Sequence, residues 1–465
     1  MTAEPSAPVP AAAKRPERGD ELDLRITALA FGGNGVARVA VDERGYVVFV
    51  RGAIPGDRVR ARVTKRKRGY AEALALEVLE PGPDRIPARA GHPGAPWEIL
   101  PYERQLQVKA EQVEDALRRL GRLDGFELEP IVPAAEQWRY RNKLEYSFGT
   151  GESGDLVCGF HAPGSWSQIV DIDDCLLASE RGEAVRRGVV GALRGMGLDA
   201  YDRRTQQGFL RNLVVREGRR TGEVQVRLVT SPGQLDAEGF LEAIEPLGVD
   251  SVVWTRAAGV AETTQGGRDV LLAGADRITE ELCGMRFALS AEAFFQTNTE
   301  MAERLYAVAG EYAALSGWER VYDLCCGIGT IGLILAPRAS EVIGVEIVEQ
   351  AVADAQANAR ANEIQNARFL AGDVRVVLRD LAEGGGPRPD VVVVDPPRAG
   401  LSKKVVGRIA EAAPKRIVYV SCNPTTLAPN AAQLVEAGYR LSRVRPVDMF
   451  PQTPHIECVA LLERA

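Results

Sequence analysis

Cysteine, long apolar runs and aromatic residues are all scarce in this chain of 465 residues. The seven cysteines are an odd number and all follow residue 157, which excludes a disulfide-rich scaffold and favours a reducing cytoplasm. No run of 18 apolar residues occurs, and the N-terminus lacks the apolar core of a signal peptide. We therefore expect neither a membrane span nor export.

The remaining composition is that of a globular protein, with 45% hydrophobic and 26% charged residues. At roughly 150 residues per domain, the length predicts about three domains. The formal net charge of −7 gives no sign of nucleic-acid binding when it is averaged over the whole chain. Residues 18–68, however, hold twelve Arg and Lys against six Asp and Glu, a local balance of +6. This segment is a candidate for contact with a phosphate backbone.

The first third of the chain contains three segments of different character. Residues 1–18 are rich in proline and alanine, and we expect a disordered tail. Residues 19–80 hold five short β-type runs between glycine-rich turns, which predict a small OB-like barrel. Residues 81–125 contain a loop and an amphipathic pattern over 102–120, which predicts a helix that links two domains.

Two larger domains are predicted in the rest of the chain, so the fold class is multi-domain. Residues 126–285 mix strand and helix patterns, as in an α+β domain. Residues 286–465 alternate strands and helices, and runs such as VVVV and IVYV predict a parallel sheet covered on both faces. This C-terminal domain is expected to be α/β and Rossmann-like.

Two basic segments are candidates for contact with RNA. They contribute Lys65, Arg66, Lys67, Arg68, Arg141 and Lys143. The run KRKR lies in a predicted turn of the barrel; a solvated hairpin tip would explain it, but a basic barrel more often follows a phosphate backbone. The segment WRYRNK interleaves aromatic residues with cations and could stack on unpaired bases. A packed strand end explains WRYRNK equally well.

A glycine-rich turn lies in YDLCCGIGTIGL (Tyr322–Leu333), between a predicted strand and a predicted helix. The spacing GxGxxG lets backbone amides approach a nucleotide closely. Glu346 closes the next strand, nineteen residues after Gly327, where a carboxylate can accept hydrogen bonds from ribose hydroxyls. Both NAD and S-adenosylmethionine fit this pattern.

Later strands bring reactive groups to the same sheet edge. VVVVDPPRAGL (Val391–Leu401) puts Asp395 at the carboxyl end of a buried strand, where open α/β sheets bind ligands. The next strand ends at Cys422; this could be a small core residue, but the Asn-Pro after it marks a turn and favours an activated nucleophile. His455 and Glu457 lie at the start of the last strand, where a carboxylate is either paired or catalytic.

These motifs, with AEAFFQTN (Ala291–Asn298), resemble the RNA uracil-5-methyltransferases, which use S-adenosylmethionine. The resemblance covers nearly the whole chain. The N-terminal barrel, with GNGVAR, GAIPGD and its basic hairpin, is similar to the TRAM RNA-binding domain of the ribosomal RNA branch of that family. The resemblance implies a monomeric RNA-binding enzyme without an obligate protein partner. Its expected substrate is 23S ribosomal RNA, with transfer RNA as the alternative.

The resemblance also implies roles for single residues. Uracil C5 is a poor nucleophile, so these enzymes add a thiolate to C6; Cys422 matches that nucleophile. Glu457 matches the general base that removes the C5 proton, and the role of His455 is less definite. The target uridine must be flipped out or presented in a loop. The residues that match cofactor-contacting positions are Gln296, Cys325, Gly327, Thr330, Glu346, Asp373 and Asp395, and Arg398 is a further candidate for RNA contact.

Two departures from the family pattern concern the site. Cys325 stands where an aromatic residue is usual, and we expect weaker packing against the adenosyl group. Pro429 and Asn430 stand where Arg-Asp is common, which bears on substrate positioning.

A third departure concerns an iron–sulfur cluster that many family members carry. Here His92 and Ala95 occupy two of the cluster-cysteine positions, while Cys175 matches the fourth. One thiolate cannot hold a cluster, so we predict a protein without one and with no other metal. His92 is expected to be a solvent-facing loop residue.

Other functions explain fewer of these residues. RNA cytosine methyltransferases usually place a cysteine in the motif that reads DPPR here, and amine methylation would favour an aromatic residue in place of Arg398. An NAD-dependent oxidoreductase is supported by the glycine loop alone. A non-catalytic RNA chaperone would not need both Cys422 and Glu457.

Overall fold

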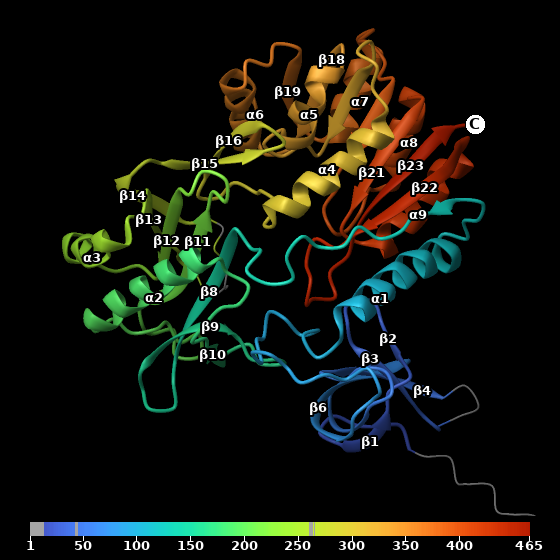
Figure 1. Ribbon diagram of the computed structural model, residues 1–465. Helices are drawn as coiled ribbons and strands as arrows, with labels where there is room; N and C mark the ends of the chain where they lie inside the picture. Colours follow the sequence, from blue (N-terminus) through green and yellow to red (C-terminus); the bar gives the residue numbers. More distant parts are fainter. Residues whose placement is uncertain (1–13, 42–44, 260–263, 265) are drawn as a thin grey trace, which may run out of the picture. The chain divides into compact units, whose positions relative to one another are not determined.

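The computed structural model describes residues 14–41, 45–259, 264 and 266–465 (Figure 1). The chain forms two compact units. The first contains Met1–Gly91, Ala95–Val108 and Gln452–Pro454, and the second contains His92–Gly94, Lys109–Pro451 and His455–Ala465. Within the described ranges, no helix combines the length and the apolar character that crossing a membrane requires.

The first unit contains the predicted barrel. Its strands are β1 (Glu21–Arg25), β2 (Ala28–Leu29), β3 (Gly35–Val39), β4 (Tyr46–Arg51), β5 (Arg58–Arg66) and β6 (Tyr70–Glu80), in the order β1-β5-β6-β4-β3-β2. The first of the five predicted β-type runs, LDLRITAL (residues 22–29), is divided between β1 and β2 because the backbone changes partner. Arg25 pairs with Arg58 of β5, whereas the amide of Thr27 donates to the carbonyl of Val36 at 2.8 Å. This change of partner closes the sheet around an apolar core.

The predicted helix over 102–120 begins at Tyr102. It continues as α1 (Tyr102–Asp115) and ends in a π-helical turn, Ala116–Leu120. In the second unit, Val113 and Leu117 belong to an apolar core shared with Leu427 of helix α9 (Pro424–Glu436). The linker helix therefore also packs against the C-terminal domain.

A seven-stranded sheet forms the central part of the second unit. Its order is β10 (Ile169–Asp171), β9 (Leu156–His161), β8 (Lys143–Thr150), β11 (Leu210–Glu217), β12 (Val224–Thr230), β13 (Ser251–Arg256) and β14 (Arg268–Gly274). Helices α2 (Glu180–Gly195) and α3 (Ala237–Ile244) pack beside it (Figure 1). The alternation of buried apolar residues along β8 puts Tyr146 under α2, where the Arg186 guanidinium lies 5.4 Å from its ring centroid. The hairpin β15 (Arg277–Leu282) and β16 (Met285–Ser290) leads to the C-terminal domain.

An eight-stranded sheet forms the C-terminal domain. Its order is β19 (Ala367–Ala371), β18 (Glu341–Glu346), β17 (Arg320–Leu324), β20 (Val391–Val394), β21 (Arg416–Ser421), β23 (Glu457–Arg464), β22 (Tyr439–Val447) and β7 (Glu127–Leu128). The neighbouring strands β19, β18, β17, β20 and β21 are parallel to one another, and β23 is antiparallel to β21. Residues 127–128, assigned to the central domain from sequence, instead extend this sheet by pairing with β22.

Helices cover both faces of the C-terminal sheet, as predicted. One apolar core holds α4 (Thr299–Ala313), α5 (Thr330–Leu335) and α6 (Glu349–Ala361); the other holds α7 (Val374–Glu383), α8 (Lys403–Ala412) and α9. Val391 and Val393 of β20 face the first core, and Val392 and Val394 face the second. All four valines are fully buried, which explains why this strand is a continuous apolar run.

Candidate active site

Three candidate residues meet at the carboxyl edge of the C-terminal sheet. Cys422 directly follows β21, and Glu457 is the first residue of β23, whose second residue, Cys458, pairs with Ser421. Asp395 directly follows β20, the other neighbour of β21. The structure therefore brings these thiol and carboxyl groups together.

Burial holds the three groups toward their uncharged forms. It raises the pKa of the half-buried Cys422 thiol to about 11, and the nearby Glu457 and Asp395 carboxyls add to the rise. The pKa of Glu457, which is 5% exposed, is raised well above its usual value by burial and then by Asp395, against the opposing effect of Arg398. Burial raises the pKa of Asp395 to about 7. Such displaced values are typical of sites that transfer protons near neutral pH.

Two asparagines hold the loop that follows Asp395 against helix α9. Asn423 caps the helix by accepting from the amide of Thr425 at 3.0 Å, and its Nδ2 donates to the carbonyl of Arg398 at 2.9 Å. Asn430, 5% exposed, accepts from the amide of Leu401 at 2.8 Å and donates to its carbonyl at 2.9 Å. The departure at position 430 thus supplies a pair of hydrogen bonds that fix this loop.

The glycine loop lies at the same edge, between β17 and α5. Cys325 and Gly327 both have positive φ values, +61° and +55°, as the chain turns away from the strand. The Glu346 carboxylate, at the end of β18, accepts from the amides of Gly327 at 3.1 Å and Val348 at 3.0 Å. At Gly329 (φ +83°), a Cβ would lie 2.9 Å from the ring of Phe369, so only glycine fits.

A buried acidic residue, which the sequence motifs did not single out, lies beneath this loop. Asp323 is 1% exposed; its Oδ2 accepts from the amide of Gly332 at 2.8 Å, while its Oδ1 has no hydrogen-bond partner within the described part of the chain. Burial raises its pKa to about 7. Tyr306 of α4, also buried, lies beside it, with its hydroxyl 3.5 Å from Thr330 Oγ1. An unpartnered buried acceptor here fits a ligand that carries positive charge, as S-adenosylmethionine does.

The other two cofactor candidates lie on either side of this loop. Asp373 follows β19, which pairs with β18, and it caps α7 by accepting from the amide of Arg375 at 2.8 Å. Its carboxylate is exposed at the sheet edge. Gln296 precedes α4 and is 8% exposed, and its carbonyl accepts from Asn142 Nδ2 at 2.9 Å.

The candidate RNA-contacting residues of the second unit differ in exposure. Arg398 is exposed, and its Nη2 lies 3.4 Å from Nδ1 of His455, whose ring packs edge-on against Phe450. Arg141 is half-buried, and its guanidinium lies 5.3 Å from the centroid of the same Phe450 ring. Arg141, Phe450, His455 and Arg398 are therefore linked by successive contacts. Lys143, by contrast, is engaged in an ion pair with Glu145 at 2.7 Å.

The four cations of the barrel hairpin are all exposed. Lys65 pairs with Glu72 at 3.2 Å, whereas Arg66, Lys67 and Arg68 form no ion pair within the described residues. The tip between β5 and β6 therefore carries three adjacent cations without an ion pair.

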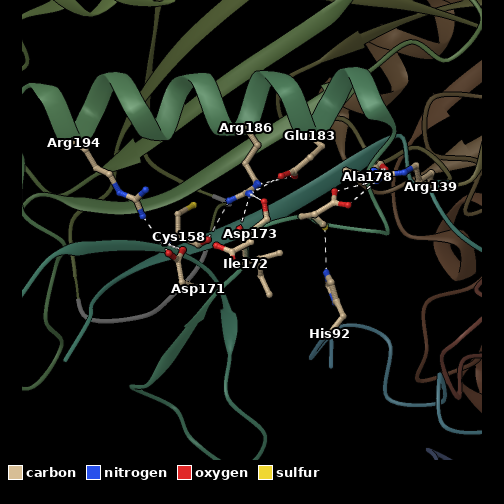
Figure 2. Close-up of polar contacts among 12 residues, drawn as sticks. His92, Arg139, Cys158, Asp171, Ile172, Asp173, Ala178, Glu183, Arg186 and Arg194 are labelled. Atoms are coloured by element: carbon tan, nitrogen blue, oxygen red, sulfur yellow. Dashed lines mark hydrogen bonds and ion pairs between the residues drawn. The ribbon is translucent and has the colours of Figure 1, made fainter. Parts of the chain in front are cut away.

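The expectation that His92 faces solvent is wrong. Its side chain is 3% exposed, and its Nε2 lies 3.2 Å from Sγ of Cys175, which is fully buried. Figure 2 labels His92 and marks this contact with a dashed line. Burial lowers the pKa of His92 to about 4, with the nearby Arg141 adding to the effect, so the ring is neutral. No group of three or more His, Cys, Asp or Glu side chains that could hold a metal occurs in the part of the chain that the structure describes. The two side chains His92 and Cys175 are too few to hold the family's iron–sulfur cluster. The absence of the cluster remains a prediction.

The fold has counterparts among known proteins. The crystal structure of a Pyrococcus abyssi tRNA (uracil-54, C5)-methyltransferase, solved with S-adenosyl-L-homocysteine, matches 95% of this chain and 100% of its own at 28% identity, with a TM-score of 0.75. The TRAM domain model matches residues 15–76, and the methyltransferase small domain model matches residues 311–419. The molecule is a methyltransferase fold with an N-terminal TRAM domain.

Sequence comparisons narrow this class to a family. The tRNA (uracil-5-)-methyltransferase model matches residues 388–465, which contain Asp395, Cys422 and Glu457. A Halalkalibacterium halodurans protein described as an uncharacterized RNA methyltransferase is 39% identical, over 96% of this chain and 97% of its own. A Clostridium tetani protein of the same description is 36% identical, over 96% and 98%. The chain belongs to the RNA uracil-5-methyltransferase family.

Proposed function

We propose that the protein transfers a methyl group from S-adenosylmethionine to C5 of a uridine in RNA, with Cys422 as nucleophile and Glu457 as general base. The observation that carries the proposal is the meeting of these two side chains and Asp395 at one sheet edge, next to the glycine loop. Gly327, Thr330, Glu346, Asp373 and Gln296 are the proposed cofactor-binding residues, with Asp323 beneath them. When bound, S-adenosylmethionine supplies the electrophilic methyl group.

The proposed reaction passes through a covalent bond between Cys422 and C6 of the uracil ring. The Cys422 thiol gives its proton to water, Sγ bonds to C6, and the electron pair of the C5–C6 double bond moves to C5. That pair bonds to the methyl carbon as the bond between this carbon and the sulfonium sulfur breaks, and S-adenosylhomocysteine would be the leaving group. The Glu457 carboxylate then takes the proton from C5, the double bond re-forms, and the bond from Sγ to C6 breaks. Arg398 opposes the rise in the pKa of Cys422, so its charge favours the thiolate.

Two RNA classes are candidates for the substrate. The first candidate is 23S ribosomal RNA, the substrate that the resemblance of the sequence implies. Transfer RNA is the second candidate, because the archaeal enzyme that acts on uracil 54 of tRNA matches 95% of this chain. The unmatched 5% is smaller than the barrel, so possession of a barrel does not separate the two substrates.

The test is methyl transfer from tritiated S-adenosylmethionine to unmodified 23S ribosomal RNA and transfer RNA transcripts. We expect label in 5-methyluridine, a loss of at least about 1,000-fold in C422A, and a loss of roughly 100- to 10,000-fold in E457Q. RNA with 5-fluorouridine at the target should form a covalent complex that C422A cannot form, because fluorine blocks the last proton removal. Wild-type activity in C422A would overturn the proposal.

A further inference from the structure

A tryptophan and an arginine stack on the surface of the central domain, outside the candidate active site. Trp166, in the loop between β9 and β10, is 57% exposed. The Arg204 guanidinium, from the loop before β11, lies 5.4 Å from the centroid of its indole ring. One exposed aromatic residue needs no explanation by itself. Here, however, a second loop holds a guanidinium over it.

Hydrogen bonds fix the two loops to each other. Arg203 Nη1 donates to the carbonyl of Trp166 at 3.3 Å, and Arg204 Nη2 donates to Ser167 Oγ at 3.0 Å. Within the tryptophan loop, Ser165 Oγ accepts from the amide of Gln168 at 2.9 Å. The ring and the guanidinium are thus positioned before a ligand arrives, which reduces the entropy lost on binding.

The charge of this surface suits an anionic ligand. The loop from His161 to Gln168 contains no acidic residue. In the second loop, Asp202 accepts from the backbone amide of Arg204 at 2.7 Å, and the Arg204 guanidinium forms no ion pair with a carboxylate of the described chain. An aromatic face beside a cation is the combination that binds unpaired nucleotides: the base stacks on the ring, and the guanidinium contacts the phosphate.

The surface lies at the edge of the central sheet where β8 begins. Strands β8 and β9 are antiparallel, with Thr150 opposite Leu156, so the loop after β9 projects from the edge where β8 begins. Asn142, which directly precedes β8, donates to the carbonyl of Gln296, one of the proposed cofactor residues. The surface and the segment that leads to the candidate active site therefore share one sheet edge.

We propose that Trp166 and Arg204 form a stacking platform for an unpaired base of the substrate RNA. The proposal rests on the proposed function, because it requires RNA as the ligand. The platform selects RNA that presents a looped-out nucleotide away from the methylated uridine.

The test measures binding of fluorescently labelled 23S ribosomal RNA fragments and unmodified transfer RNA to the full-length protein by anisotropy. We expect W166A to weaken binding of the substrate RNA roughly tenfold, within the range known for loss of one base–aromatic stack, and W166F to change it less than about threefold. R204A should weaken binding and lower the slope of log K against log salt by about 0.7, whereas R204K keeps the slope.

A second exposed tryptophan provides the control. Trp318 is 55% exposed with Lys415 Nζ 4.3 Å from its ring centroid, and it precedes β17, at the edge of the C-terminal sheet opposite the candidate active site. Equal RNA affinities of W166A and W318A, with both proteins folded by circular dichroism, would overturn the platform. If W166A does not fold, W166L removes the ring and keeps an apolar side chain for the same comparison. Failure of the wild-type protein to bind either RNA would instead overturn the proposed function.

Discussion

At the scale of single residues, the candidate active site is dominated by burial. Cys422, Glu457 and Asp395 are each held toward the protonated form because the site removes them from water, and for Cys422 and Glu457 the nearby carboxyl groups add to the effect. A buried acid that keeps its proton reduces the stability of the folded chain above the pH at which the unfolded chain would lose it. This relation makes the environment of Glu457 measurable.

We predict that E457Q stabilises the folded protein at pH 8 but not near pH 4. The unfolded chain loses the Glu457 proton near pH 4.5 and the folded chain keeps it to higher pH, so the wild-type free energy of unfolding falls as pH rises through this window. Glutamine has no proton to lose, and we expect a gain of about 1 kcal/mol or more at pH 8 in urea unfolding.

The exposed Glu383, at the end of α7, is the control for that measurement. E383Q should change the free energy of unfolding by less than about 0.5 kcal/mol at both pH values. A pH-independent effect of E457Q would contradict the assigned burial of its charge.

Strand-end residues could be predicted from sequence, whereas residues defined by burial could not. Cys422 and Asp395 are predictable because each ends an apolar run and precedes a turn. Asp323 is harder to predict because it lies within such a run, although a charged residue in YDL is an available signal. The glycine- and proline-rich segment around His92 does not by itself indicate burial, but the family resemblance places His92 and Cys175 at ligand positions of one cluster and so contained the signal for their contact.

At the scale of elements, a fixed loop leads into β23. Buried donors from three segments hold Asp448–Pro451: Lys109 Nζ bonds to Asp448 Oδ1 (2.5 Å) and the Phe450 carbonyl (3.0 Å), Tyr140 to the Pro451 carbonyl (3.0 Å), and Asn298 to the Met449 carbonyl (2.9 Å). Lys109 and Asp448 are both fully buried. The loop that precedes His455 and Glu457 is therefore positioned from several directions.

We predict that K109M lowers the free energy of unfolding by about 3–5 kcal/mol, because it leaves the Asp448 charge buried and unpaired. The double variant K109M/D448N should recover part of this loss, measured by urea unfolding. R118A is the control. It removes an exposed ion pair (2.8 Å) between Arg118, in the π-helical turn that follows α1, and Glu114, and it should lower the free energy of unfolding by less than about 1 kcal/mol. Equal effects of K109M and R118A would contradict the prediction.

The contact between His92 and Cys175 lies within the second unit, where it joins His92 to the central domain. We predict that H92A lowers the free energy of unfolding by about 1–3 kcal/mol, because it removes a buried ring and its contact with the thiol.

The purified protein should contain no iron in metal analysis. An absorbance band near 400 nm with about four irons per chain would contradict the cluster-free prediction.

Element types could be predicted better than element partners. Patterns of polar and apolar residues predict the strands of the barrel, the linker helix and the parallel sheet correctly. The division of LDLRITAL and the pairing of residues 127–128 with β22 depend on contacts between distant segments, which periodicity does not contain.

At the scale of the whole molecule, net charge conceals local charge. The excess of +6 over residues 18–68 is offset by β6, because its glutamates pair with arginines of β5: Glu77 with Arg60 at 2.5 Å and Glu80 with Arg58 at 2.6 Å. The exposed cations of this segment without an ion pair within the described residues then include Arg66, Lys67 and Arg68, which cluster at the hairpin tip, and the separate Arg18 and Arg51. Charge counting over the sequence selects a domain as the candidate for RNA contact, and the ion pairs distinguish the cations within it that are already paired from those that are not.

We predict that R66A/K67A/R68A weakens RNA binding mainly at low salt and leaves the turnover number at saturating RNA within about twofold. Each phosphate that the protein no longer neutralises should lower the slope of log K against log salt by about 0.7–0.9, so the three substitutions together should lower it by up to about 2.7. The control K403A/K404A/R408A removes the same charge from α8 of the methyltransferase domain. If both triple variants change the slope equally, general charge attraction explains RNA binding and the hairpin has no special part in it. If only the hairpin variant changes it, the barrel contacts the phosphate backbone through this tip.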